Sequence, residues 1–244
     1  DVSRPVVLEQ IDFPKPEIAV AIRGETQGDE DKLGEVLPKL HEEDPTFVAE
    51  FDAELHQTIA RGMGELHLAV QLERMKRKYG VAVGMEQPKI GYRETITKEA
   101  EGQGRHKKQS GGHGEFGDVH LNIKPLPRGS GFEYKNTITG GVVPKQYIPA
   151  VENGVKEFMV RGPLGFPVVD ISVTLTDGQF HAVDSSDMAF KKAAGQAMRE
   201  GMPKANPVLL EPIFQVEILL PNEFTSKIQR LVSGRRGQIL GFDA

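Results

Sequence analysis

Two helical stripes separated by strand patterns constrain the fold of residues 14–87 more than any other feature of the chain. Over residues 29–43, apolar side chains recur at helical spacing at Leu33, Val36, Leu37 and Leu40. Over residues 65–79, a second stripe comprises Leu68, Leu72, Met75 and Tyr79. Strand patterns precede, separate and follow the stripes, at 17–23, 46–51, 55–61 and 81–85. The order β-α-β-β-α-β predicts a ferredoxin-like sandwich.

A second α+β domain is predicted over residues 98–205, after a linker at 88–97. Its predicted order is β-β-β-α-β-α. The segments located by pattern are strands at 119–123, 132–139 and 168–175 and helices at 149–161 and from Ser185 or Ser186 to about Glu200. A serine at the start of the last helix is a favourable N-cap. Gly201 and Pro203 are expected to end that helix.

Residues 206–244 predict the start of a third domain, with a strand at 213–219, a helix at 222–232 and a strand at 238–242. This β-α-β order is half of a ferredoxin-like fold, which leaves a sheet edge and a helix face uncovered. We therefore expect the sequence to be a piece cut inside its last domain, with residues 1–13 as a lead-in to the first.

Residues 106–118, HKKQSGGHGEFGD, combine glycines with basic and histidine side chains and carry almost nothing apolar. The glycines are expected to free the backbone for positive φ and for close approach to another surface, and are Gly111, Gly112, Gly114 and Gly117. Arg105, Lys107 and Lys108 add positive charge. The stretch therefore suits contact with phosphates, and a flexible hairpin is the alternative.

Composition limits the other classes of function. A net charge of −5 does not indicate nucleic-acid binding, although basic residues can still cluster locally. The absence of cysteine from the sequence excludes disulfides and cysteine metal sites. We find no apolar run long enough to span a membrane and no signal-peptide pattern, and we expect a cytoplasmic protein that acts as a monomer.

Enzyme chemistry finds little support in the sequence, which contains no GxxxxGK[ST] phosphate loop. Four histidines, at 106, 113, 120 and 181, match no zinc spacing, so no metal site is predicted. His181 near Asp184, Asp187 and two serines would suit a hydrolase, but capping of the next helix explains the serines better. We therefore predict no catalytic residue in this chain.

Eight runs of the sequence occur in the order of one known family. They are LHEEDPTF (40–47), RGMGELHL (61–68), PLPRGSGFEY (125–134), GGVVPKQYIPAV (140–151), GFPVVDISVTL (165–175), HAVDSSDMAF (181–190), LLEPI (209–213) and RRGQILGF (235–242). On these runs the chain resembles the C-terminal half of bacterial elongation factor G, the translocase of the ribosome. The resemblance implies domain III at 14–87, domain IV at 98–205 with a left-handed βαβ crossover, and part of domain V from 206.

The resemblance also implies sites and partners, namely the ribosome and the tRNA–mRNA complex in its decoding region. Two loops would form the contacting tip, through Gln109, Ser110, Gly111, Gly112, His113, Gly114, Gly178, His181 and Asp184. Coupling to the GTPase module falls on the turn of Arg61, Gly62, Met63, Gly64 and Glu65. A possible contact with ribosomal RNA falls on Lys227, Arg230, Arg235 and Arg236, for which a solvated helix face is the alternative. GTP and Mg²⁺ would belong to the full-length factor, and no cofactor is expected in this chain.

Three positions depart from the housekeeping members that the chain resembles. His113 stands where an arginine is usual, Asp118 where a histidine is usual, and Ser110 where a threonine is usual. A largely neutral histidine and an added carboxylate should weaken phosphate binding by the loop. This difference suggests a paralogue that acts in ribosome recycling or in protection of the ribosome from a bound drug.

Overall fold

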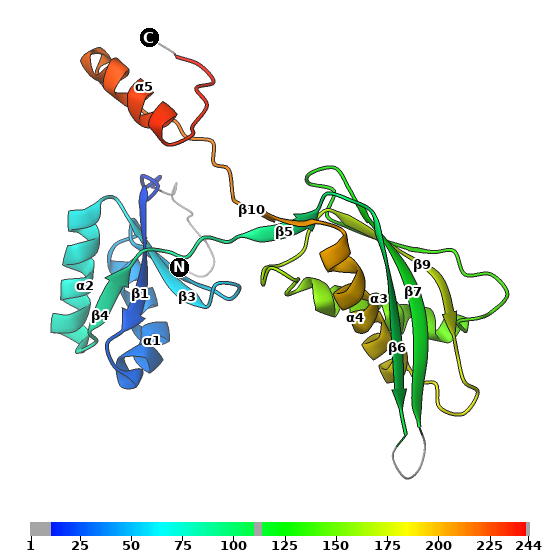
Figure 1. The fold of residues 1–244 in the computed structure, drawn as a ribbon. Helices are drawn as coiled ribbons and strands as arrows, with labels where there is room; N and C mark the ends of the chain where they lie inside the picture. Colours follow the sequence, from blue (N-terminus) through cyan, green and yellow to red (C-terminus); the bar gives the residue numbers. More distant parts are fainter. Residues whose placement is uncertain (1–10, 110–113, 243–244) are drawn as a thin grey trace, which may run out of the picture. The chain divides into compact units, whose positions relative to one another are not determined.

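The structure is a computed structural model that describes residues 11–109 and 114–242. The chain divides after Glu211 into two compact units, which are described separately (Figure 1). The first unit contains both predicted α+β domains, and the second contains the segment that follows them.

The first domain has the predicted order of elements. They are β1 (Ile18–Gly24), α1 (Gln27–Glu43), β2 (Val48–Asp52), β3 (Gln57–Gly62), α2 (Glu65–Tyr79) and β4 (Val83–Glu86). These strands form one antiparallel sheet in the order β2-β3-β1-β4. This is the arrangement of a ferredoxin-like sandwich, as predicted.

Both predicted helical stripes lie in the core of this domain. Leu40 and Met75 are fully buried, and they share one apolar cluster with Ile22 and Ala60 of the sheet. Burial of a side chain of this size contributes about 1.5–3 kcal/mol. Helix α1 begins where the side chain of Thr26 accepts a hydrogen bond from the amide of Asp29, and α2 ends at Gly80, where φ is 65°.

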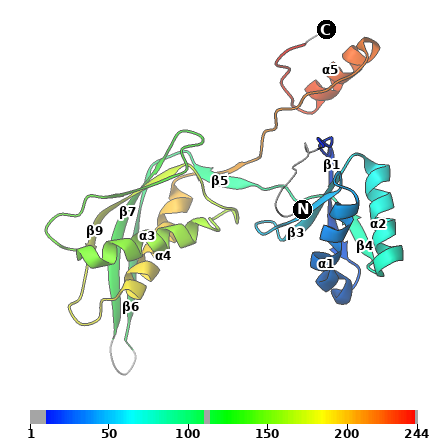
Figure 2. The same ribbon diagram turned by 180° about the vertical axis from the view of Figure 1, so that it is seen from behind.

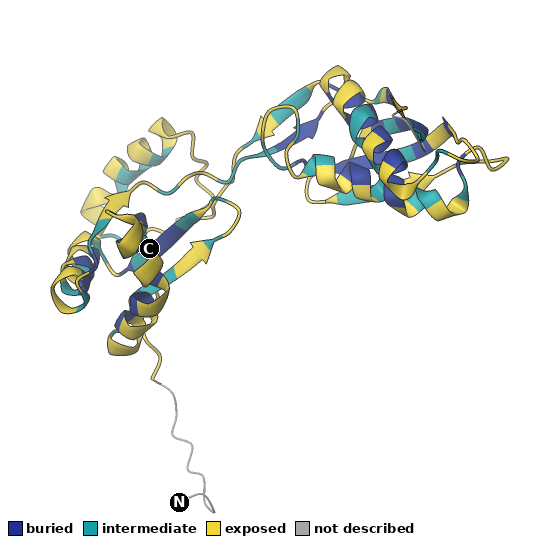
Figure 3. Ribbon diagram, turned by 90° about the horizontal axis from the view of Figure 1, so that it is seen from below, coloured by how far each residue is buried: buried dark blue, intermediate teal, exposed yellow. Residues whose placement is uncertain are grey.

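The second domain also has the predicted order, β-β-β-α-β-α. Its elements are β6 (Ala100–Lys108), β7 (Glu115–Pro125), β8 (Phe132–Asn136), α3 (Ile148–Met159), β9 (Ile171–Gln179) and α4 (Asp187–Lys204). The sheet order is β6-β7-β9-β8, in which β8 and β9 are parallel and are joined through α3 (Figure 2). The buried residues gather between this sheet and its two helices (Figure 3).

Glycines allow α4 to lie directly on the backbone of β6. A Cβ atom at Gly102 would collide with the carbonyl oxygen of Ala197, and one at Gly104 with that of Ala193. In the same way, a Cβ atom at Gly117 of β7 would lie 3.0 Å from the carbonyl of Ala189. The expectation that Gly117 takes positive φ is therefore wrong, because it lies in a strand where the helix leaves no room for a side chain.

Strand β5 corrects the prediction of a plain linker at 88–97. Residues Arg93–Ile96 form β5, which pairs with β10 (Pro207–Leu210), so the strand after residue 206 completes the first unit. Gly201 and Pro203 do not end α4, which continues to Lys204. Gly201 lies against Gly102 and Ile123, so the helix keeps its close packing through its last turn.

The second unit begins at residue 212 and contains α5 (Thr225–Gly234), preceded by a short 3₁₀ turn at Asn222–Phe224. This agrees with the helix predicted at 222–232. The strands predicted at 213–219 and 238–242 do not form. A strand is stabilised by pairing with a neighbour, and within the described residues neither segment has one, so Ile213 is 94% and Leu219 90% exposed. In the described part of the chain, no helix is long and apolar enough to cross a membrane.

Candidate functional site

The ends of β6 and β7 that flank the first predicted loop lie at the same end of the second-domain sheet as the second loop (Figures 1 and 2). The β6–β7 hairpin forms one, and the segment after β9 forms the other, because β7 and β9 are neighbours and Asp118 pairs with Gln179. Of the first loop, Ser110, Gly111, Gly112 and His113 lie outside the described residues. Gln109 is exposed, and Gly114 is partly buried.

The second loop presents His181 and holds it by local contacts. The side chain of His181 is 57% exposed, and its Nδ1 atom lies 3.3 Å from Oδ2 of Asp184. The amides of Val183 and Asp184 also point at Nδ1, at 3.4 and 3.3 Å. The ring meets the edge of the Phe116 ring, with centroids 6.3 Å apart. His181 therefore offers a polar aromatic surface from a fixed position.

Hydrogen bonds join the two loops. The amide of Gly114 donates to Oδ1 of Asp184 over 3.0 Å, and the amide of Phe116 donates to the carbonyl oxygen of Asp184 over 2.7 Å. The hydroxyl of Ser185 donates to the carbonyl oxygen of Phe116 over 2.9 Å. Gly114 and Asp184 were predicted to lie in separate loops. Phe116 and Ser185 were not predicted, because their role depends on neighbouring strands that no local pattern indicates.

Asp118 lies elsewhere than the sequence suggested. It is in β7 and 2% exposed, and one of its oxygens accepts a hydrogen bond from Nε2 of Gln103 over 3.1 Å. Its other oxygen lies 3.6 Å from Nε of Arg105, which also stacks over the ring of Phe116. Asp118 is therefore buried in the sheet beside Arg105 and does not lie in the loop itself. That its carboxylate weakens phosphate binding stays a prediction.

The three histidines of this domain that the structure describes, His106, His120 and His181, each lie beside a different carboxylate. Nε2 of His106 lies 2.6 Å from Glu115, and Nε2 of His120 lies 3.7 Å from Asp118. Hydrogen bonds from Lys192 and then His106 lower the pKa of Glu115 to about 2, although desolvation opposes them. Within the described residues, no three metal-ligating side chains converge on one point.

The serines near His181 serve the fold. Ser186 caps α4, as predicted, because its Oγ accepts from the amide of Ala189 over 3.2 Å. The hydroxyl of Ser185 donates to Phe116, and its Oγ accepts from the backbone amide of His181. A serine nucleophile must give its proton to a base, so the arrangement of Ser185 does not favour a hydrolase.

The turn predicted to couple the domains, Arg61–Glu65, is held by His67. Nδ1 of His67 accepts from the amide of Met63 over 3.0 Å, and Nε2 lies 2.9 Å from Asp44. Gln71 donates to the same oxygen of Asp44 over 2.6 Å. Although desolvation opposes ionisation of Asp44, hydrogen bonds from Thr46 and His67 hold its pKa below the ordinary value. Asp44 and Gln71 were not predicted at this turn, because Asp44 lies 23 residues before His67 and Gln71 meets the turn only through Asp44 and His67.

In the second unit, the four basic residues predicted to contact RNA are exposed. Lys227 and Arg230 lie on α5, and Arg235 follows its last residue. The ammonium of Lys227 lies 5.4 Å from the centre of the Phe224 ring. Exposure agrees equally with RNA contact and with a solvated helix face.

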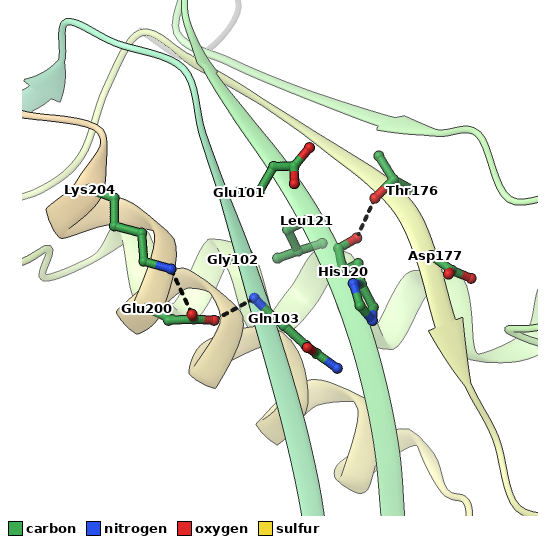
Figure 4. A pocket seen from close by; sticks show the side chains of 9 residues that line it. All are labelled: Glu101, Gly102, Gln103, His120, Leu121, Thr176, Asp177, Glu200 and Lys204. Atoms are coloured by element: carbon green, nitrogen blue, oxygen red, sulfur yellow. Dashed lines mark hydrogen bonds and ion pairs between the residues drawn. The ribbon is translucent and has the colours of Figure 1, made fainter.

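A polar hollow lies at the edge of the second-domain sheet (Figure 4). Here Glu200 of α4 accepts a hydrogen bond from the backbone amide of Gln103 over 2.6 Å and another from Lys204. Thr176 donates to the carbonyl oxygen of His120 over 3.1 Å. The contact of Glu200 with Gln103 binds α4 to the edge strand β6, and that of Thr176 with His120 joins β9 to β7. An edge strand would otherwise expose unpaired backbone groups, so the hollow serves the fold.

Comparison with known proteins identifies these domains. Residues 13–87 match the family model "Elongation Factor G, domain III", and residues 88–206 match "Elongation factor G, domain IV". The ferredoxin-like domain and the second α+β domain, in which α3 joins the parallel strands β8 and β9, are therefore two domains of a translation factor. The chain belongs to the elongation factor G family.

Two relatives show how much of a whole protein is present. The chain is 57% identical over 229 residues to the "Elongation factor G-like protein" of Synechocystis, covering 94% of this chain and 34% of that protein. A solved structure from Thermus thermophilus matches with a TM-score of 0.88 and 43% identity, covering 99% of this chain and 37% of the other. The chain thus spans about a third of the length of these relatives.

Proposed function

We propose that this chain supplies the ribosome-contacting domains III and IV of a translational GTPase of the elongation factor G type. In this proposal, the two loops at the end of domain IV touch the tRNA–mRNA complex while it moves through the decoding region. The observation that carries the proposal is the joining of these loops at one end of the sheet through Gly114 and Asp184. A pair of loops fixed on a rigid scaffold is typical of a binding surface.

The chemistry of the loops suits nucleic acid. Lys107, Lys108 and Gln109 are exposed at the end of β6, where they can meet phosphate oxygens. The exposed ring of His181 can stack on an unpaired base or donate a hydrogen bond to RNA. Phosphate contacts make binding fall steeply as the salt concentration rises.

The remaining parts of the proposal concern the whole factor. GTP and Mg²⁺ bind a GTPase module outside this sequence, and the Arg61–Glu65 turn passes the state of that module to domain IV. The factor acts as a monomer in the cytoplasm, where it meets ribosomes. The basic residues of α5 and Arg235 contact ribosomal RNA.

A specialised paralogue is the second candidate. It is supported by His113, which stands where housekeeping members usually carry arginine, and by the name of the Synechocystis relative, an elongation factor G-like protein. Such a factor would recycle ribosomes or free them from a bound drug. Translocation by the full-length factor at the rate of a housekeeping enzyme would exclude this candidate.

The test is His181→Ala in the full-length factor, with tRNA–mRNA movement and GTP hydrolysis measured on the ribosome. We expect movement to slow about tenfold, equivalent to ~1.4 kcal/mol of activation free energy, while GTP hydrolysis stays unchanged. His120→Ala is the matched control, because His120 lies within β7 of the same sheet and is not one of the predicted contact residues. Unchanged movement in His181→Ala would contradict the proposal.

A further inference from the structure

The loop after β9 meets the β6–β7 hairpin through one acidic side chain and through the backbone of Phe116. Oδ1 of Asp184 accepts the hydrogen bond from the amide of Gly114. Next to this bond, the backbone amide of Phe116 donates to the carbonyl oxygen of Asp184, and the carbonyl oxygen of Phe116 accepts from the hydroxyl of Ser185. The carboxylate of Asp184 therefore links two segments that lie 70 residues apart in sequence.

The missing side chain of Gly114 makes room for this carboxylate. A Cβ atom at residue 114 would lie 2.9 Å from Cγ of Asp184 and 3.1 Å from each carboxylate oxygen. Contacts so short would push the carboxylate away, since real Cβ atoms essentially never approach other atoms below 3.0 Å. Gly114 and Asp184 are thus complementary in shape as well as in hydrogen bonding.

The second oxygen of Asp184 faces the exposed histidine. Oδ2 lies 3.3 Å from Nδ1 of His181, so the same carboxylate contacts both loops. The side chain of Asp184 is 24% exposed, so most of it is shielded from water, which strengthens the hydrogen bond that it accepts from Gly114. Because an ionised carboxylate repels phosphates, this inward position also keeps its charge away from an RNA partner.

We propose that Asp184 is a positioning residue that joins the His181 loop to the end of the β6–β7 hairpin, so that both meet RNA as one body. This role rests on the function proposed above for the same loops. A surface whose parts are already fixed loses less conformational entropy on binding. Asp184 acts through Gly114 and His181, and it makes no RNA contact of its own.

The first experiment measures amide hydrogen exchange by NMR in the full chain, without ribosomes. Asp184→Ala is expected to speed exchange at Gly114 at least about tenfold, the change that ~1.4 kcal/mol produces, while the chemical shifts of the domain core stay unchanged. Asp184→Asn retains an acceptor oxygen and should preserve most of the protection. Asp177→Ala is the matched control, because that carboxylate accepts from its own neighbour, Gly178.

Gly114→Ala tests the contact from the other side. Both Gly114→Ala and Asp184→Ala should speed amide exchange at Phe116, because the Phe116 amide donates to Asp184 beside this contact. The double variant should exchange no faster at Phe116 than either single variant, since both substitutions remove the same contact. Exchange at Gly114 that is unaffected by Asp184→Ala would overturn the proposal. Additive effects of the two substitutions at Phe116 would also overturn it.

The second experiment measures tRNA–mRNA movement by the full-length factor. Asp184→Ala should lower the maximal rate about fivefold and leave the half-saturating factor concentration unchanged, with Asp184→Asn and Asp177→Ala close to the parent. If His181→Ala slows movement but Asp184→Ala does not, the positioning role is wrong while the proposed function stands. If neither variant affects movement, the proposed function fails, and the positioning role on RNA fails with it.

Discussion

The two domains of the first unit bury their helices in different ways. In residues 18–86, large side chains such as Leu40, Phe47 and Met75 fill the space between the helices and the sheet. In the second domain, α4 instead lies on β6 through Gly102, Gly104 and small helix residues. The core of the first domain depends on large side chains that fill the space between helix and sheet. The contact of α4 with β6 depends on the absence of side chains at the glycines. We therefore expect the first domain to be sensitive to lost atoms and the second to added atoms.

The largest expected effect is that of Gly104→Ala. Its Cβ atom would overlap the carbonyl oxygen of Ala193, and backbone on both sides cannot move aside easily. We expect a loss of about 4 kcal/mol in the free energy of unfolding, above the usual range for an extra methyl group. Urea denaturation followed by NMR signals of the second domain would measure it.

Gly84→Ala is the matched control for this substitution. Gly84 also lies in a strand, β4, but a Cβ atom there would have nothing within 4 Å. We expect a change below about 0.5 kcal/mol. Equal effects of the two substitutions would contradict the packing difference between the domains.

The opposite sensitivity is tested by Leu40→Ala in the first domain. Leu40 is fully buried, so its truncation leaves a cavity and should cost about 3 kcal/mol. Leu40→Met keeps most of the volume and should cost less than about 1.5 kcal/mol. Leu66→Ala, on the exposed side of α2, is the control with no expected effect. If Leu40→Ala lost as little stability as Leu66→Ala, the first domain would not depend on filled volume.

The same difference decides what could be predicted from the sequence. Helices α1 and α2 were predictable because bulky apolar residues at helical spacing report which face is buried. Strand β6 was not located, because Gly102 and Gly104 leave no apolar side chain that would mark a buried face. That Asp118 lies in a strand was predictable in principle, because Val119, Leu121 and Ile123 alternate along β7 and are all buried. Its burial was not, because this alternation places residue 118 on the opposite face of the strand.

Contacts between distant segments were beyond any local pattern. Strand β5 forms because it pairs with β10, which lies more than a hundred residues further along the sequence. The four residues of β5 are too few to show a strand pattern by themselves. The strands expected at 213–219 and 238–242 show the converse, an alternating pattern without a paired neighbour in the described residues. At the candidate site, the loops were predicted from the resemblance, and the hydrogen bond between Gly114 and Asp184 required the structure.

In the first unit, Glu94 stabilises backbone amide groups with a buried side chain. It is fully buried in β5, and its carboxylate accepts from the amides of Leu164 and Phe166 over 2.8 and 3.1 Å. Glu94→Ala leaves both amides unpaired, so we expect a loss of about 2 kcal/mol. Glu94→Gln keeps one acceptor oxygen and should lose less. Chemical denaturation of both variants would measure this, and an unaffected Glu94→Ala would show that water replaces the carboxylate.

The smallest expected effect concerns Glu115, which lies at the surface of the second domain. Hydrogen bonds from Lys192 and His106 lower its pKa to about 2, from an ordinary value of 4.5. Because the folded pKa is depressed, its contribution is complete above the unfolded pKa and is lost as the pH falls from about 4.5 to about 2. The stability difference between the parent and Glu115→Gln should therefore shrink over that interval, which urea denaturation at several pH values would measure.

Glu43 of the first domain offers the matched case for this pH dependence. Hydrogen bonds from Lys78 and Tyr79 lower its pKa as well, and its carboxylate also meets Arg74. Since both carboxylates are solvated, salt should weaken both contributions. Measuring Glu43→Gln and Glu115→Gln at low and high salt tests whether the domains differ only in their cores. A salt-insensitive effect at Glu115 alone would show that close packing of α4 on the β6–β7 hairpin also shields the charges at its edge.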